Sequence, residues 1–504
     1  MMNTKTYSPH CIALSFILLF GGCTTVGPDY IPPDPKVPES FNTKVEDQTF
    51  KPKNSHSNED NNQNLPEIPV KRVTPEMLAD WWKTLEDPLL SQLVKKAVEN
   101  NLDLKLAQSR VREERARREI ASAGNKPNVN LGGSTTNQRG LNQVGGGSST
   151  NTLVSSGFDA SWEIDLFGGI QRSVEAADAT LQASQEQLND TLVTLVAEVA
   201  LNYLEIRTFQ ARLQAAEKNR KSQENSLQIV EDRLKAGLTT TLTRAQARYN
   251  LESTRSEIPT LKIGIEQGKN GLSVLLGEFP GALKQSLDDD SKIPLTPIEV
   301  VVGVPADLLR RRPDVRQAER ELASQTARVG VATAELYPKL RLLGSVGLET
   351  ISAASFFAGP AAAYQIGPQV SWNIFSAGRI RQNIKVEDEI QEQALIRYES
   401  TVLKSVQEVE NALIDYAEEQ VRRQSLLKSI KSAQEAAELA RELYTAGLSD
   451  FLGVLEAERS LFTFQDRLAQ SEGKVVSNLI RLYKALGGGW KPLMADAPEE
   501  NLNS

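Results

Sequence analysis

Side chains able to carry enzyme or metal chemistry are scarce in this sequence and lie near its start. Among 504 residues there are two cysteines and two histidines, namely Cys11, Cys23, His10 and His56. His56 lies in a polar stretch typical of unstructured chain. From about residue 65 onward there is neither Cys nor His, which excludes thiol nucleophiles, Cys/His zinc sites and histidine acid–base chemistry there. The sequence therefore predicts no enzyme activity and no metal site.

Cys23 is the one cysteine whose surroundings indicate a chemical role. It follows an apolar run at residues 11–20, which has the length of a signal-peptide core and is too short to span a bilayer as a helix. The small residues Gly21 and Gly22 complete a segment that resembles a bacterial lipoprotein signal. This resemblance implies N-palmitoyl and S-diacylglycerol chains on Cys23, with Thr24 favouring the outer membrane, and no other cofactor. The alternative is an ordinary secretory peptide with an incidental cysteine.

Charge and local composition narrow the class of protein further. The net charge of -8 argues against a nucleic-acid binder that depends on phosphate contacts. No glycine-rich loop followed by Lys-Ser/Thr is present, so the sequence contains no nucleotide-binding motif of this kind. The region from Gly27 to about residue 70 is rich in Pro, Asn and charge, which indicates an extended tether.

The sequence contains an internal repeat with an offset of about 210 residues. Trp162 corresponds to Trp372, and the Ala-Gly-Leu sequence around Gly237 corresponds to the same three residues around Gly447. Each half has the same order of parts: a helical run, two strands, a long helix and, after Ala-Gly-Leu, another helix. We expect the helical runs at about 89–122 and 314–336, the long helices at about 169–235 and 379–445, and the ends of the last helices near 276 and 486.

The long helices carry apolar seams with matching spacings of 4, 3, 4 and 3 residues, which are typical of helix–helix packing. The seam residues are Leu192, Val196, Val199, Tyr203 and Ile206 in the first half, and Val402, Val406, Val409, Leu413 and Tyr416 in the second. About 67 proline-free residues at 1.5 Å each would make a rod of roughly 100 Å.

The strand pairs, at 128–138 with 152–164 and at 339–350 with 362–374, alternate with roughly period two. Open sheet edges do not occur in lipid, and transmembrane barrels start at about eight strands. Four strands in a membrane would therefore need partner copies. Tryptophans near strand ends suit a membrane interface. A small soluble sheet is the alternative.

A series of sequence motifs extends through nearly the whole chain. They are "GPDYIPP", "LEDPLLSQLVKKAVENNLDLKLAQSRV", "FDASWEIDLFGGIQRSVEAADA", "ESTRSEIPTLKIGIEQGKNGLSVLLGE", "PADLLRRRPDVRQAERELA" and "LYKALGGGW". In this order they resemble the outer-membrane factor family of TolC-like export channels, and more closely the NodT/OprM-like lipoproteins that serve resistance–nodulation–division (RND) efflux pumps.

This resemblance implies a mainly α protein with a membrane β part. Three chains would form a twelve-stranded β-barrel, four strands per chain, continued by an α-helical tunnel into the periplasm. The homotrimer would be a passive exit duct in the outer membrane, joined through a periplasmic adaptor (membrane fusion) protein to an inner-membrane RND pump. The expected domains are a signal peptide (1–22), an acylated tether (23–70), a first structural repeat (71–290), a second structural repeat (291–490) and a flexible tail (491–504).

The Ala-Gly-Leu sequences are expected where a descending helix reverses direction, because glycine tolerates the positive φ of a helix C-cap. The resemblance places these turns at the periplasmic tip, in contact with the adaptor. The residues so assigned are Gly237, Leu238, Thr239, Gly447, Leu448 and Ser449. The alternative is that they form turns only.

The resemblance also places a channel gate after the second turn, at Leu452 and Glu456, with Tyr444 nearby. Residues four apart share a helix face, so a trimer would present a leucine ring and a carboxylate ring that favours cations. Other members lock the gate with an aspartate and an arginine, but Thr243 and Ser449 stand at those positions here. Closure is therefore expected to depend on the leucine ring and on helix packing.

Two further functions remain open at this point: the outer-membrane component of a protein secretion system, which would have the same fold, and a periplasmic scaffold that conducts nothing. The transported substrate, whether drug, dye, solvent or metal ion, and the partner pump are not predicted.

Overall fold

A computed structural model describes residues 25–34, 37, 70–71, 78–141, 148–283, 287, 292–294, 300–301, 311–350 and 361–490. The expected signal peptide, Cys23, most of the expected tether and the expected tail lie outside these residues.

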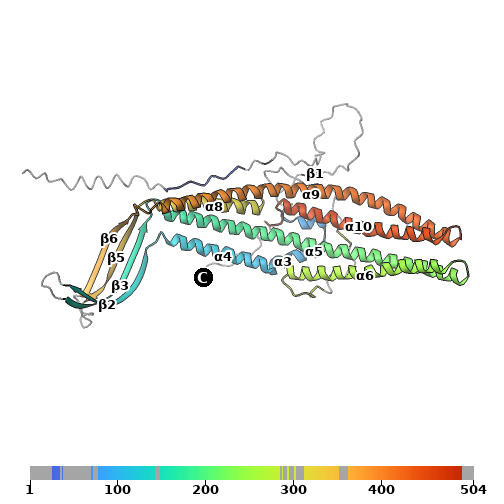
Figure 1. Ribbon diagram of the computed structural model, residues 1–504, viewed down its shortest axis with the longest axis horizontal. Helices are drawn as coiled ribbons and strands as arrows, with labels where there is room; N and C mark the ends of the chain where they lie inside the picture. Colours follow the sequence, from blue (N-terminus) through green and yellow to red (C-terminus); the bar gives the residue numbers. More distant parts are fainter. Residues whose placement is uncertain are drawn as a thin grey trace, which may run out of the picture. The chain divides into compact units, whose positions relative to one another are not determined.

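Helices form most of the described chain, and the order of elements is repeated (Figure 1). The first half contains β1 (Val70–Lys71), the short 3-10 helix η2 (Trp81–Leu85), α3 (Pro88–Asn100), α4 (Leu102–Ala123), β2 (Asn128–Leu141), β3 (Ser148–Ile164), α5 (Gly169–Lys235) and α6 (Thr241–Leu275). The second contains β4 (Val300–Val301), α8 (Pro313–Ala334), β5 (Lys339–Thr350), β6 (Ala362–Ser371), α9 (Arg379–Thr445) and α10 (Phe451–Ala485). No helix among the described residues is both long and apolar enough to cross a membrane.

The chain divides into two compact units, and each receives segments from both halves of the repeat. The first, here called the sheet unit, draws on Met1–Asp34, Arg110–Gln185 and Gln317–Glu399. The second, here called the hairpin unit, draws on Pro35–Ser109, Glu186–Arg316 and Ser400–Ser504.

The sheet unit contains a four-stranded antiparallel sheet in the order β2-β3-β5-β6. Each half of the repeat supplies one hairpin, and β3 pairs with β5 to join them. The four predicted strands are confirmed, although β2 and β3 extend further into the Gly/Ser-rich connection than expected. Within the described chain, β2 and β6 form the two edges of this sheet.

The hairpin unit contains two antiparallel helix pairs (Figure 1), which are α5 from Glu186 onward with α6, and α9 from Ser400 onward with α10. Both long helices have the predicted bounds, 169–235 and 379–445. The predicted seam forms the core, since Leu192, Val196, Val199 and Ile206 are completely buried. This burial of one stripe, rather than local propensity, stabilises helices of such length.

The first predicted helical run, 89–122, is broken at Asn101 into α3 and α4, which differs from the sequence prediction. The Asn101 side chain accepts a hydrogen bond from the Leu104 amide at 2.9 Å, as an N-cap does, and donates to the Leu275 carbonyl at the end of α6 at 3.0 Å. In the second half Arg312 takes the corresponding place and donates to the Ala485 carbonyl at the end of α10 at 2.9 Å. The "RRRPD" phrase therefore contains a residue that satisfies an open helix C-terminus.

Candidate functional site

One face of the sheet carries a row of apolar side chains that runs across all four strands. Directly paired residues on neighbouring strands lie on the same face, and one such row contains an apolar residue from every strand. The row consists of Leu131, Phe158, Val346 and Tyr364, whose exposures are 70, 54, 59 and 86%. An exposed apolar row across a whole sheet is unfavourable in water and suited to lipid.

The opposite face of the sheet is polar. The next row along the strands consists of Asn130, Asp159, Ser345 and Gln365. On the same face, Arg341 and Glu163 form an ion pair at 2.9 Å. Alternation of an apolar and a polar face is the pattern of strands in a transmembrane barrel, where one face contacts lipid and the other a polar lumen.

Two tryptophans occupy equivalent places at the helical end of the sheet. The Trp162 indole donates to the Asn125 carbonyl just after α4, and the Trp372 indole donates to the Leu336 carbonyl just after α8, both at 3.0 Å. Trp162 and Trp372 are 39 and 59% exposed. A ring exposed on one side with its N–H satisfied is typical of the membrane–water interface, and this placement agrees with the position predicted for both residues.

The segment that follows Cys23 is bound to the sheet unit through a buried arginine. The Arg172 side chain is 4% exposed and contacts Asp29 at 2.6 Å, and its guanidinium donates to the Val26 carbonyl at 3.1 Å. The Val26 amide donates to the Phe167 carbonyl at 3.1 Å. Burial lowers the pKa of Arg172, but its hydrogen bonds to Asp29 and Glu175 outweigh this and raise the pKa above its usual value.

Close backbone approaches add to this attachment. A Cβ atom at Gly27 would collide with the Gly330 backbone in α8, and one at Gly168 would collide with Thr25. Gly27 and Gly168 have φ values of 89° and 76°, a conformation that favours glycine. Thr25, two residues after Cys23, is therefore fixed just beyond the end of β3.

The two helix reversals have the predicted glycine geometry. Gly237 and Gly447 have φ values of 71° and 76°. The Gly237 amide donates to the Leu234 carbonyl at 3.0 Å and the Leu238 amide to the Arg233 carbonyl at 2.8 Å, which is a Schellman motif. The same two bonds recur around Gly447 with the same lengths.

The residues assigned to adaptor contact lie at these reversals and are accessible. Leu238 and Leu448 are 65 and 76% exposed, Ser449 is exposed and Thr239 is half-buried. Large apolar side chains exposed on tight turns are available to a partner.

Leu452 and Glu456 lie on the exposed face of α10, opposite its buried face. Leu452 is 57% exposed and Glu456 is also exposed, whereas Val454 and Leu455 are buried. The structure therefore brings these two predicted gate residues onto one free helix face, as their spacing indicates.

Tyr444 does not share that face. It is 5% exposed and packs within an apolar cluster at the reversals, with its ring 5.2 Å from that of Phe451. The Arg233 guanidinium lies 4.8 Å from the Tyr444 ring centre and donates to the Thr445 carbonyl at 3.1 Å, which joins the ends of α5 and α9. The Tyr444 hydroxyl has no hydrogen-bond partner among the described residues. In this chain Tyr444 supports the tip from inside.

Thr243, at the position of the lock aspartate in the resemblance, belongs to a helix cap instead. Its amide donates to the Thr240 side chain at 3.3 Å, and the two hydroxyls are 3.2 Å apart. Thr240 is the N-cap of α6, and Asp450 takes the same role for α10. Thr243 therefore belongs to the N-terminal cap of α6.

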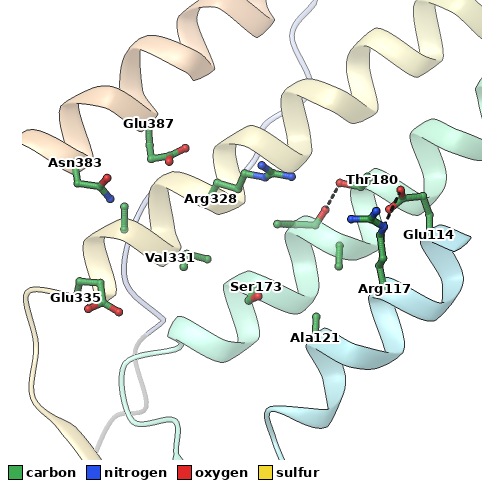
Figure 2. A pocket seen from close by; sticks show the side chains of 13 residues that line it. Glu114, Arg117, Ala121, Ser173, Thr180, Arg328, Val331, Glu335, Asn383 and Glu387 are labelled. Atoms are coloured by element: carbon green, nitrogen blue, oxygen red, sulfur yellow. Dashed lines mark hydrogen bonds and ion pairs between the residues drawn. The ribbon is translucent and has the colours of Figure 1, made fainter. Parts of the chain in front are cut away.

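An open groove of about 450 Å³ lies in the sheet unit, lined by parts of α4, α5, α8 and α9. Figure 2 shows its charged side chains, among them Arg117, Arg328 and Glu387, extending from several helices around small residues such as Ser173. Arg328 is exposed and Glu387 accepts a hydrogen bond from Gln325 at 2.6 Å. These charges are spread along a solvated surface and do not converge on one point.

Among the described residues no group of three or more His, Cys, Asp and Glu could hold a metal ion.

The sequence matches the family model described as outer membrane efflux protein, and it does so twice, at residues 93–278 and 304–488. The two matches begin 211 residues apart and end 210 apart, which confirms the internal repeat. The cation efflux system protein CusC of Escherichia coli O6:H1 is 31% identical over 96% of this chain and 98% of its own length. The pyoverdine export outer membrane protein OpmQ of Pseudomonas aeruginosa is 33% identical over 82% of this chain and 88% of its own length.

Among solved structures, the outer-membrane channel OprN has a TM-score of 0.84 and 33% identity, covering 93% of this chain and all of its own. The fold, the internal repeat, the sequence match and the two-faced sheet thus all indicate the same family. The chain belongs to the outer membrane efflux protein family.

Proposed function

We propose that three copies of this chain close a twelve-stranded barrel in the outer membrane and form the passive exit duct of a tripartite RND-type efflux system. The observation that carries the proposal is the two-faced four-stranded sheet with edges at β2 and β6. Such edges are unfavourable in lipid, and four strands are half the smallest transmembrane barrel. Copies joined β6 to β2 satisfy the edges while keeping the apolar row outside and the polar row inside.

The duct requires an energy source outside the chain, and the proposed partners are an inner-membrane pump and a periplasmic adaptor. The relatives are named for different cargoes, a cation for CusC and pyoverdine for OpmQ. The duct itself therefore accepts more than one substrate class across the family, and the pump selects. A strain lacking this protein, compared with its complemented parent on dyes, antibiotics, and copper and silver salts, is expected to be hypersensitive to the cargo. A wild-type response to every compound, in a strain whose other exporters are also deleted, contradicts an efflux role.

We further propose that Cys23 carries the lipid anchor. Thr25 is fixed beside Gly168, a few residues past the end of β3, and the interfacial Trp162 lies within β3. Acyl chains on Cys23, two positions before Thr25, would then reach the periplasmic leaflet of the outer membrane without a longer stretch of polypeptide between them and the sheet. Two or more chains give stable attachment where one does not.

Replacing Cys23 with alanine is expected to remove all acyl mass from the mature protein while leaving the contacts of Arg172 intact. Mass spectrometry of the N-terminal peptide measures the first effect, and protection of residues 25–34 from proteolysis measures the second. Cys11→Ala is the matched control and should change neither. Acyl chains found on the Cys23→Ala protein would overturn the assignment.

The exposed leucines at the two reversals are proposed to bind the adaptor. Leu448→Asp, alone and with Leu238→Asp, is expected to weaken adaptor binding at least tenfold, because a charge replaces apolar contact surface at the tip. Both side chains are largely exposed, so the melting temperature should change little. Unaltered adaptor affinity in the double variant, measured with detergent-solubilised trimers, would restrict these residues to turn formation.

A further inference from the structure

A buried carboxylate joins three helices of the hairpin unit close to the candidate gate. The Glu458 side chain, on α10, is 6% exposed. One of its oxygens accepts hydrogen bonds from the Ser226 hydroxyl of α5 at 2.6 Å and from the Arg441 guanidinium of α9 at 2.8 Å. Arg441 also donates to the Ser222 hydroxyl of α5 at 2.8 Å. These four side chains, here called the Glu458 cluster, connect the second hairpin to the long helix of the first.

Glu458 occupies a position where an apolar residue would pack well. Glu458 continues the buried stripe of Phe451, Val454 and Leu455 at helical spacing. A carboxylate removed from water costs free energy unless charged and hydrogen-bonding partners compensate it. Since the compensation comes from α5 and α9 together, α10 is held in one arrangement against both.

Only one half of the repeat contains this arrangement within the described part of the chain. At the offset of 210 residues, Glu458 corresponds to Arg248, Arg441 to Glu231 and Ser226 to Ala436. Arg248 is exposed, and no ion pair joins it to Glu231. The hairpin with the cluster is the one that carries the Leu452–Glu456 face, six and two residues before Glu458.

We propose that Glu458 is a positioning residue for the gate: its bonds to Ser226 of α5 and to Arg441 of α9 hold α10 against both helices and thereby hold Leu452 and Glu456 in the closed arrangement. The channel opens when α10 moves away from α5 and the Glu458–Ser226 bond breaks. This inference rests on the proposed channel function.

The test is single-channel conductance of purified trimers in planar bilayers. Glu458→Gln removes the charge on which Arg441 depends but keeps the size of the side chain, and it is expected to raise open probability about tenfold, as for loss of one charge-assisted hydrogen bond. Ser226→Ala, a smaller change, should raise it in the same direction. The double variant Arg441→Glu/Glu458→Arg restores an ion pair of reversed polarity and should return open probability toward that of the wild type.

A second ion pair between α5 and α10 supplies the matched control. Arg212 and Asp466 lie 2.7 Å apart with side chains 19 and 22% exposed, two helical turns further along α10. Asp466→Asn removes comparable charge pairing and should leave open probability unchanged. Equal opening by Asp466→Asn and Glu458→Gln would show general loosening and overturn the proposal.

Leu452→Ala separates this inference from the channel function itself. If Leu452→Ala trimers conduct more than the wild type while Glu458→Gln and Ser226→Ala trimers keep the wild-type open probability, the positioning role is overturned. If no trimer conducts, including Leu452→Ala, the proposed channel function fails and the positioning role fails with it.

Discussion

Lysine in place of Val346 is expected to abolish assembly of the trimer in the outer membrane, whereas lysine at the adjacent Ser345 is expected to leave assembly intact. Val346 belongs to the apolar row and is 59% exposed, while Ser345 belongs to the polar row on the other face. A lysine facing lipid near the middle of the membrane costs roughly 2–4 kcal/mol. Three copies per trimer multiply that cost, which is comparable to the whole stability of many proteins.

Semi-native electrophoresis of outer-membrane fractions measures this difference, because trimers and unfolded chains migrate differently. Val346→Leu keeps an apolar side chain at the same place and should assemble, which separates charge from size. Trimers of Val346→Lys as abundant as those of Ser345→Lys would mean that the apolar row does not face lipid.

Neutralising Glu456 is expected to have the second large effect, a loss of cation preference of about tenfold. In the proposed trimer three Glu456 carboxylates would surround the pore. At about 8 Å from a passing cation in water, each contributes roughly 0.5 kcal/mol of attraction, so three contribute about 1.5 kcal/mol, or roughly tenfold in cation occupancy. Glu456→Gln removes this attraction without changing the size of the side chain.

Reversal potentials across a salt gradient measure the change in selectivity, and the effect should shrink as ionic strength rises. Glu442, another exposed glutamate, lies on α9 before the second reversal, and Glu442→Gln is the control expected to leave selectivity as it is. A Glu456→Gln channel with the selectivity of the wild type would show that Glu456 lies away from the lumen.

The sequence predicts the elements of this fold well where the signal is long and regular. The proline-free runs with apolar residues at spacings of 4, 3, 4 and 3 predict both long helices with the observed bounds. The prediction is reliable because the same apolar periodicity indicates a helix along all 67 residues. The glycines at the reversals are predictable because glycine adopts that backbone conformation more readily than any other residue.

Tertiary contacts explain what the sequence does not predict. Asn101 interrupts the first helical run because its side chain reaches the end of α6, a partner 174 residues away. The resemblance places Tyr444 with the gate, yet its ring packs on Phe451 inside the tip. Glu458 could have been noticed as a charge on an apolar stripe, but its partners on α5 and α9 are visible only in the folded chain.

Single-channel recording from reconstituted trimers tests most directly whether three copies of this chain make a conducting duct. Wild-type trimers are expected to give discrete, cation-preferring conductance steps, and Leu452→Ala trimers larger or more frequent ones, because three bulky apolar side chains leave the pore. Trimers that are verifiably inserted in the bilayer but silent in both forms would contradict the duct and leave a non-conducting scaffold.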